Sequence, residues 1–160
     1  MRILGIDPGT SLIGYGIIDA AGSSYAIVKF GEIRSVAGMP APERAAHVYE
    51  RLEILVKEFE PEVIAVEKLF FFKNAKTVMA VSEMRGVIML FAAQKKIPLR
   101  EFTPLQVKQA VTGYGRAEKK QVQSMIKMIF GLKQAPKPDD VADALAIAVC
   151  CANTRVYWPR

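Results

Sequence analysis

The chain is poor in the residues that build zinc sites, disulfide scaffolds and most nucleophilic active sites. It has two cysteines, Cys150 and Cys151, and one histidine, His47. Adjacent cysteines on a predicted helix point in different directions, and neither a Cys-x-x-Cys pair nor a Cys/His spacing typical of zinc is present. We therefore expect structural thiols in a reducing cytoplasm. His47 lies in a polar stretch, where a surface or packing role is the ordinary one.

Signals for secretion, membrane insertion and nucleotide binding are equally scarce. The first residues lead directly into a strand that Asp7 interrupts, which is unlike a secretory signal. The longest strictly apolar run, Val87 to Ala93, is too short to span a bilayer. Neither a Gly-x-Ser-x-Gly nucleophile elbow nor a Walker A loop is present. We expect a cytoplasmic protein without a membrane partner.

What the chain has is enough apolar material for one folded domain, together with a surplus of positive charge. Of its 160 residues, 51% are hydrophobic. This composition predicts a single globular domain over 1–160, with 155–160 as a tail that could fray. The 22 Lys and Arg residues exceed the 16 Asp and Glu residues, for a net charge of +6. Such a surplus favours a polyanionic partner such as nucleic acid or an acidic membrane.

The apolar pattern predicts elements in the order β-β-β-α-β-α-β-α-α-α. Thr103-Pro104 is a clean helix start, with Thr as the cap and Pro at the first helical position. The first three strands predict an antiparallel meander, and the later units predict an α/β fold: a five-stranded mixed sheet with helices on both faces. The expected strands are 2–7, 12–19, 25–34, 62–67 and 97–102, and the expected helices are 43–58, 76–94, Thr103-Pro104 to near Gly113, 117–130 and 139–153.

Two glycines mark one face of the second expected strand. Gly14 and Gly16 lie two residues apart, so both belong to the same face. That bare face would let another backbone or a ligand come close. Relief of packing under a helix explains the pair equally well.

Four carboxylates, Asp7, Glu67, Asp140 and Asp143, lie at the ends of predicted core elements. Asp7 and Glu67 each close an apolar run, and if their strands are adjacent and parallel, both acids project from one sheet edge. Asp140 and Asp143 are one turn apart near the start of an Ala-rich helix. Packed together, four carboxylates would repel one another, and divalent cations with oxygen ligands remove that cost. Two such cations about 3.5–4 Å apart would serve hydrolysis of a phosphodiester.

Each acid also has a structural explanation to be weighed. A lone Asp at a strand end, such as Asp7, usually caps a turn. Negative charge at a helix N-terminus is favoured by ~0.3–1 kcal/mol, which accounts for Asp139 and Asp140. Asp143 fits this explanation poorly because its neighbours look buried, and a turn has no need of Glu67. Asp139 could share the face of Asp143, but we assign it the N-cap role.

Several short motifs occur in order along essentially the whole chain. They are Gly5-Ile-Asp-Pro-Gly9 with Gly14-Tyr-Gly16, Glu67 with Phe70 and Lys73-Asn74-Ala75, Arg85-Gly86, Gln106-Val-Lys108-Gln109, Gly113-Tyr-Gly115 with Ala117-Glu-Lys119, and Asp140-x-x-Asp143-Ala-Leu-Ala. Together these motifs resemble the RuvC-type Holliday-junction resolvases of bacteria. The resemblance implies a ribonuclease-H-like fold, a homodimer, and Mg²⁺-dependent cleavage of four-way DNA junctions in recombination and repair. It also implies 3′-hydroxyl and 5′-phosphate products and a branch-migration motor complex as a partner.

The resemblance also assigns roles to single residues. The metal ligands fall on the four acids Asp7, Glu67, Asp140 and Asp143, with two Mg²⁺ ions per site and Mn²⁺ as a possible substitute. Lys108 and Lys119 match the family's catalytic-site lysines, and Phe70 matches its base-contacting aromatic.

DNA contacts are expected around these motifs. Stacking of Phe70 on an unpaired base would contribute ~1–3 kcal/mol. At least two members of the Phe70-Phe71-Phe72 run are expected to fold back into the core or a dimer interface, Phe71 or Phe72 among them. Lys119 and Lys120 follow a Gly-rich hinge near a helix start, where a phosphate would offset their unfavourable interaction with the helix dipole. Phosphate contacts are expected from Lys73, Lys76, Arg85, Lys108, Arg116, Lys119 and Lys120.

The expected helix at 76–94 is apolar on more than one stripe. We expect one side to face the core and the other a partner subunit, with full burial in one subunit as the alternative.

Two other functions fit parts of the sequence. The segment from Gly5 to Thr10 resembles the first phosphate loop of actin-like ATPases and phosphotransferases, although 160 residues cannot hold the usual two lobes. The third hypothesis is a junction-binding module without catalysis, against which the complete set of acids argues.

Overall fold

The computed structural model describes residues 1–68 and 75–154, and the side chains of all of these except 75 and 76. The elements follow the predicted order, and their ends differ from the predicted ones by no more than a couple of residues. No helix in the described ranges is long and apolar enough to cross a bilayer. The elements are β1 Arg2–Asp7, β2 Leu12–Ala21, β3 Ser24–Arg34, α1 Ala41–Phe59, β4 Val63–Glu67, α2 Ala75–Gln94, β5 Leu99–Phe102, α3 Pro104–Thr112, α4 Lys119–Ile129 and α5 Asp139–Asn153.

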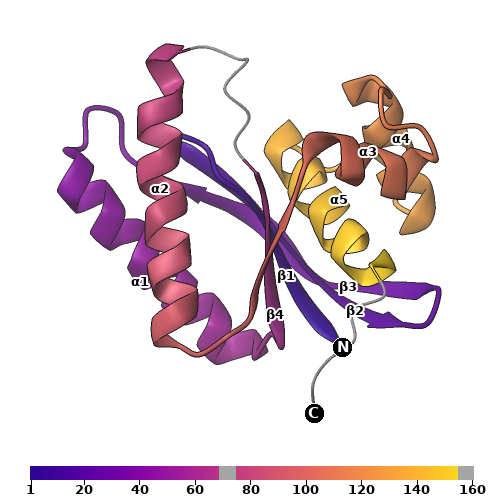
Figure 1. Ribbon diagram of the computed structural model, residues 1–160, viewed down its shortest axis with the longest axis horizontal. Coiled ribbons are helices and arrows are strands. Elements are labelled where there is room, and N and C mark those ends of the chain that lie inside the picture. Colours follow the sequence, from indigo (N-terminus) through magenta and orange to yellow (C-terminus); the bar gives the residue numbers. More distant parts are fainter. Residues whose placement is uncertain (69–74, 155–160) are drawn as a thin grey trace.

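The five strands form one sheet in the order β3-β2-β1-β4-β5 (Figure 1). β1 pairs antiparallel with β2, and β2 pairs antiparallel with β3. The pairs β1–β4 and β4–β5 are parallel. This arrangement confirms the predicted mixed α/β sheet and has the strand order and directions of a ribonuclease-H-like fold.

Side chains of the strands alternate between two hydrophobic cores. Leu4 and Ile6 of β1 belong to the core shared with α1 and α2, which includes Phe91. Ile3 belongs to the core on the other face, where Leu145 of α5 is buried. Figure 1 shows α1 and α2 on one side of the sheet and α5, with α3 and α4, on the other. Helices therefore cover both faces, as predicted.

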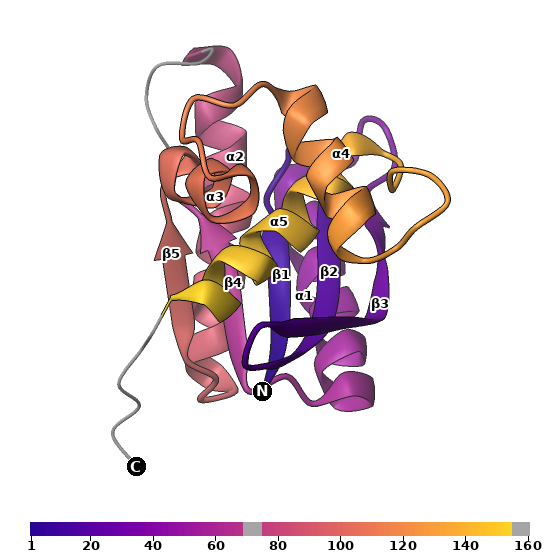
Figure 2. The ribbon, with the colours of Figure 1, turned by 90° about the vertical axis from the view of Figure 1, so that its right-hand side faces the viewer.

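Glycines in β1 and β2 allow α5 to lie directly on the strands, which it crosses obliquely (Figure 2). A Cβ atom at Gly14 would stand 2.1 Å from the carbonyl oxygen of Asp140, and one at Gly5 would stand 2.2 Å from that of Ala144. At Gly16 the Cβ would meet the side chain of Leu145 at 2.6 Å. Of the two explanations for the Gly14 and Gly16 face, the close approach of a helix is therefore the right one.

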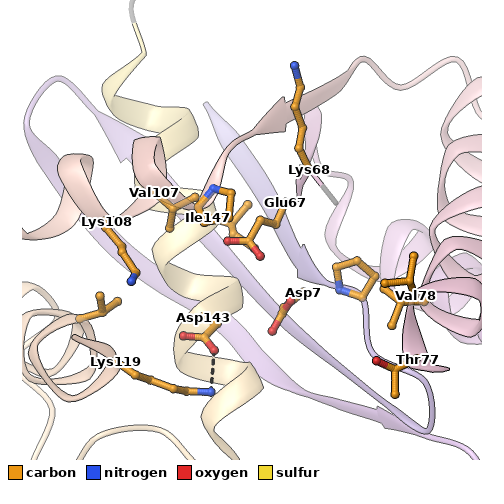
Figure 3. Close-up of a pocket in the computed structure, with 14 residues that line it drawn as sticks. Asp7, Glu67, Lys68, Thr77, Val78, Val107, Lys108, Lys119, Asp143 and Ile147 are labelled. Atoms are coloured by element: carbon orange, nitrogen blue, oxygen red, sulfur yellow. Dashed lines mark ion pairs between the residues drawn. The ribbon is translucent and has the colours of Figure 1, made fainter. Parts of the chain in front are cut away.

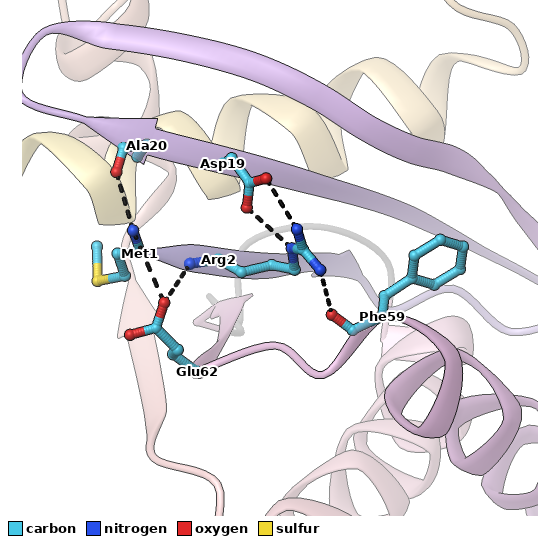
Figure 4. Close-up of polar contacts among 6 residues, drawn as sticks. All are labelled: Met1, Arg2, Asp19, Ala20, Phe59 and Glu62. Carbon is cyan, nitrogen blue, oxygen red and sulfur yellow. Dashed lines mark hydrogen bonds and ion pairs between the residues drawn. The ribbon is translucent and has the colours of Figure 1, made fainter.

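The end of β1 that lies away from Asp7 is tied to its neighbours by Arg2 (Figure 4). The guanidinium donates to both carboxylate oxygens of Asp19 on β2, at 2.8 and 2.9 Å. It also donates to the carbonyl oxygen of Phe59 at the end of α1, at 2.9 Å. One side chain thus joins two strands and a helix through charge-assisted hydrogen bonds.

A single subunit buries only part of the apolar surface of α2. Met84, Ile88 and Phe91 are fully buried in the core, whereas Met79 is 71% exposed and Leu90 56% exposed. The alternative of full burial within one subunit is therefore wrong, and α2 carries an outward apolar surface.

Candidate active site

Two of the predicted acids meet at one edge of the sheet. Asp7 is the last residue of β1 and Glu67 the last of β4. The two strands are parallel neighbours, and Ile6 lies opposite Val66. Asp7 and Glu67, the residues that follow these two, therefore lie side by side at the same end of the strands. By alternation both belong to the face that α5 covers. The predicted meeting of these two acids at the carboxyl ends of adjacent strands is thus present.

A third acid joins them from α5 across a cavity of about 460 Å³. Asp143 lies one turn into α5, on a helix whose neighbouring residues are buried. Figure 3 shows the carboxylates of Asp7, Glu67 and Asp143 directed toward the same space. The cavity is lined by Asp7, Pro8, Glu67, Lys68, Thr77, Val78, Val81, Pro104, Val107, Lys108, Lys119, Val122, Asp143 and Ile147.

The fourth acid, Asp140, does not line this cavity. It stands one turn before Asp143, half-buried at the start of α5, where its backbone carbonyl rests above Gly14. Its charge nevertheless acts on the site, because it contributes to the raised pKa of both Asp7 and Asp143. The structure therefore brings three of the predicted ligands to the cavity and leaves the fourth at its edge.

Burial and mutual repulsion destabilise the ionised carboxylates in this cavity. Burial raises the pKa of Asp7 well above its ordinary value, and the charges of Asp143, Glu67 and Asp140 raise it further. Burial also raises the pKa of Asp143, although Lys119 opposes the shift. A cation bound among buried carboxylates that repel one another stabilises their ionised form.

Lys119 supplies one such cation at the first position of α4. Its ammonium lies 3.0 Å from Oδ2 of Asp143 and 3.6 Å from Oδ2 of Asp139. Burial lowers the pKa of Lys119, but the hydrogen bond to Asp143 and the charges of Asp139 and Asp140 outweigh it, so the pKa is raised overall.

The predicted N-cap role of Asp139 is wrong. Pro138 occupies the N-cap position of α5, and no side-chain hydrogen bond caps this helix. Asp139 is instead the first helical residue, and its exposed carboxylate reaches across to Lys119.

Lys108 reaches the cavity from α3. This helix begins with a capping box in which Thr103 and Gln106 satisfy each other's backbone N–H groups, as the Thr-Pro start predicted. Val107 and Val111 are buried. With these anchors, Lys108 directs its ammonium toward the carboxylates in Figure 3.

The other predicted DNA contacts differ in their surroundings. Arg116 and Lys120 are exposed around the start of α4 and do not line the cavity. Arg85 forms an ion pair with Glu101 of β5 and is largely buried, so its charge is already neutralised. Phe70, Lys73 and the tail at 155–160 lie outside the described residues, as do Phe71, Phe72 and the side chain of Lys76.

Two residues that the sequence did not single out also line the cavity. Thr77 enters from the start of α2, and Lys68 follows Glu67, although Figure 3 shows its ammonium directed away from the acids. An isolated Thr near a helix start carries no distinctive sequence signal, and only the packing of α2 beside β4 reveals its place.

The donor set fits a hard divalent cation such as Mg²⁺. All candidate ligands are carboxylate oxygens, which Mg²⁺ and Mn²⁺ prefer, and none of the described residues that line the cavity carries a thiol or an imidazole. Within the described part of the chain, no three acidic, histidine or cysteine side chains are close enough to share one ion in this arrangement. Asp143 points instead at Lys119. Asp7, Glu67, Asp140 and Asp143 could hold the metal after a change of side-chain rotamer.

Sequence comparison identifies one family along nearly the whole chain. The family described as crossover junction endodeoxyribonuclease RuvC matches residues 3–151. A protein of that description from Alkaliphilus metalliredigens is 53% identical over 154 residues, which cover 96% of this chain and 94% of the relative. Another, from Pelotomaculum thermopropionicum, is 52% identical over 160 residues, covering 100% and 97%.

Solved structures agree with this assignment. Thermus thermophilus RuvC is 34% identical, with a TM-score of 0.86 over 94% of this chain and 92% of its own. The same protein solved in complex with a Holliday junction substrate gives a TM-score of 0.87. The resemblance in the motifs is therefore confirmed at the level of the whole fold. From its sequence, its sheet topology and these relatives, the chain belongs to the RuvC family of crossover junction endodeoxyribonucleases.

Proposed function

We propose that the protein is a Mg²⁺-dependent endonuclease that resolves four-way DNA junctions by paired nicks during recombination and repair. The observation that carries the proposal is the convergence of Asp7, Glu67 and Asp143 with Lys108 and Lys119 on one cavity. Membership of the RuvC family and the relative solved with a Holliday junction substrate support the substrate class.

In this proposal, Asp7, Glu67, Asp140 and Asp143 hold two Mg²⁺ ions, for which Mn²⁺ can substitute. When bound, the ions neutralise the scissile phosphate and increase the acidity of water near it. Lys108 and Lys119 contact the non-bridging phosphate oxygens and stabilise the charge that develops on them. The products are a 3′-hydroxyl and a 5′-phosphate.

DNA would lie over the α3–α4 side of the cavity. The start of α4 carries the positive end of the helix dipole, and the basic residues Lys108, Arg116, Lys119 and Lys120 lie on this side of the molecule. Phe70, Lys73 and Lys76 follow Glu67 in sequence and are proposed to contact the strand beside the cleaved phosphate. Arg85 is the weakest of the proposed contacts, since Glu101 already neutralises it.

A homodimer would give two sites related by the approximate two-fold symmetry of a junction. We place the interface on the outward surface of α2, where Met79, Met89 and Leu90 are exposed. Apolar side chains gathered on one helix face are typical of subunit interfaces. A branch-migration motor complex, the partner that the family resemblance implies, would deliver the junction to this dimer.

Cleavage of a synthetic four-way junction with and without Mg²⁺ tests the proposal. We expect two symmetric nicks in the junction, none in a linear duplex of the same arm sequence, and none without the metal. Asp7→Asn should retain junction binding, because phosphate contacts and shape dominate affinity. Tight junction binding without cleavage in any divalent metal would favour a non-catalytic module, and saturable ATP binding would favour the ATPase hypothesis.

A further inference from the structure

Lys119 stands between two carboxylates of the same helix, and the two have different surroundings. Asp143 lies in the cavity with its side chain 30% exposed, and Asp139 lies at its outer edge, 56% exposed. The ammonium is 3.0 Å from the first and 3.6 Å from the second. Asp139 and Asp143 are four residues apart, so both lie on one face of α5. A small movement of the lysine side chain would transfer it from one to the other.

The ammonium of Lys119 lies close to a carboxylate that lines the cavity. Oδ2 of Asp143 is 3.0 Å from the Lys119 ammonium (Figure 3). A divalent cation beside Asp143 would repel this ammonium across a partly dehydrated space. Lys119 would therefore have to leave Asp143 before the carboxylate can become a ligand.

The surrounding structure permits such a movement without disturbing the backbone. Val122 and Ile126 anchor α4 in the core, and Glu118 and Gln121 form a capping box at its start. A cation at a helix N-terminus is unfavourable for the helix itself, so Lys119 gains its stability from the acids it faces. Asp139 makes no capping hydrogen bond that would hold it elsewhere.

We propose that Lys119 is an internal counter-cation that competes with the divalent metal for Asp143, and that Asp139 is a positioning residue that receives Lys119 when the metal binds. The inference rests on the proposed function, because it requires that these acids bind a divalent cation. It adds a role for Asp139 and an order of events: the lysine shifts to Asp139 as the metal enters, and it contacts the phosphate only when DNA binds afterwards.

Isothermal titration with MgCl₂ in the absence of DNA tests this exchange. Lys119→Met should bind Mg²⁺ about two- to fivefold more tightly than the wild type, the range expected for loss of one competing, partly exposed ion pair. Lys119→Arg should stay near the wild-type affinity because it keeps the charge. Lys120→Met removes the same charge from the next residue, which forms no ion pair with any described residue, and should change metal affinity much less. Weaker or unchanged binding by Lys119→Met would overturn the inference.

Asp139→Asn separates positioning from simple loss of charge. In the wild-type background it should weaken Mg²⁺ binding by about two- to threefold, because Lys119 loses its alternative partner. In the Lys119→Met background it should have little further effect. Equal weakening in both backgrounds would mean that Asp139 acts only through its own charge, and would overturn its positioning role.

The thermal stability of the metal-free protein provides a second readout. Lys119→Met should lower the Tm more than Lys120→Met does, and saturating Mg²⁺ should close that difference. If Lys119→Met does not fold, Lys119→Gln takes its place in both experiments. If the wild type shows no Mg²⁺ binding that depends on Asp7, both the proposed function and this inference are wrong. If the wild type binds Mg²⁺ through Asp7 but substitution of Lys119 leaves the affinity unchanged, this inference alone is wrong.

Discussion

The two ends of β1 carry charge in opposite conditions. At one end, Arg2 is matched by Asp19 and by a backbone carbonyl, in partly exposed surroundings (Figure 4). At the other end, Asp7 is crowded by acids that raise its pKa, and the charge of Lys119 opposes them (Figure 3). β1 is six residues long, so the stabilising contacts of Arg2 and the repulsion around Asp7 lie at the two ends of one short strand. The difference supports the proposal that the Asp7 end binds a cation, because an unrelieved cluster of acids does not help to hold the fold together.

The largest expected effect is the loss of cleavage when the crowded end is neutralised. Asp7→Asn should lower the junction cleavage rate by about a thousandfold or more, because it removes a ligand charge at the reacting phosphate. The same change should raise the Tm of the metal-free protein, because it relieves repulsion among the acids. Rates from labelled junctions and thermal unfolding in EDTA measure the two effects. A variant with normal cleavage would remove Asp7 from the metal site.

The glycine face that seats α5 is the next most sensitive feature. Gly14→Ala should destabilise the protein by about 1–3 kcal/mol, because its Cβ would stand 2.1 Å from the carbonyl oxygen of Asp140. Cleavage should fall as well, since displacement of α5 moves Asp140 and Asp143. Gly86→Ala is the contrasting change: within one subunit its Cβ meets open space on α2, and at protein concentrations too low for the proposed dimer it should add about 0.5–1 kcal/mol of stability. Urea unfolding curves of both variants decide the point.

The crowded end also predicts how stability depends on pH. Because the pKa of Asp7 in the folded protein is raised above its ordinary value of 3.8, the folded state binds more protons than the unfolded state between those two values. Metal-free stability should therefore fall as the pH rises through this window. Urea unfolding in EDTA measures the free energies of unfolding of the wild type and of Asp7→Asn. The wild-type value minus the variant value should decrease as the pH is raised from about pH 4. A constant difference would contradict the crowding of Asp7.

The smallest expected effect on the protein comes from a change at the Arg2 end of β1. Arg2→Met should lower the Tm modestly, because it removes hydrogen bonds to Asp19 and Phe59 that are partly exposed to water. Mg²⁺ affinity and junction cleavage should remain at wild-type levels, since this end lies away from the cavity. Thermal unfolding and cleavage assays on the same preparation measure both. Reduced Mg²⁺ affinity in this variant would show that the two ends are coupled.

Local signals in the sequence identified the acids, but they did not identify every partner. Apolar runs ending in Asp7 and Glu67 predicted the two strand ends, and the Thr103-Pro104 pair predicted the start of α3. The role of Asp139 was mistaken, because a one-residue difference between N-cap and first helical position changes where its carboxylate points. Its contact with Lys119 comes from another helix, which no local pattern reports.

Glycine spacing shows the same limit. The two-residue interval placed Gly14 and Gly16 on one face, but could not say whether a helix or a ligand would cover it. The pairing of Arg85 with Glu101 and the place of Thr77 in the cavity also depend on segments that meet only in the folded chain.

The sequence alone determines the order of elements, the alternation of side chains along the strands and the kinds of side chain available for the site. These features depend only on short-range periodicity and on residue chemistry. Which acids face one cavity, which lysine neutralises them and which glycines lie beneath α5 were settled only by tertiary packing. Those relations join residues distant in the sequence, and their energies depend on distance and burial, which no local pattern contains.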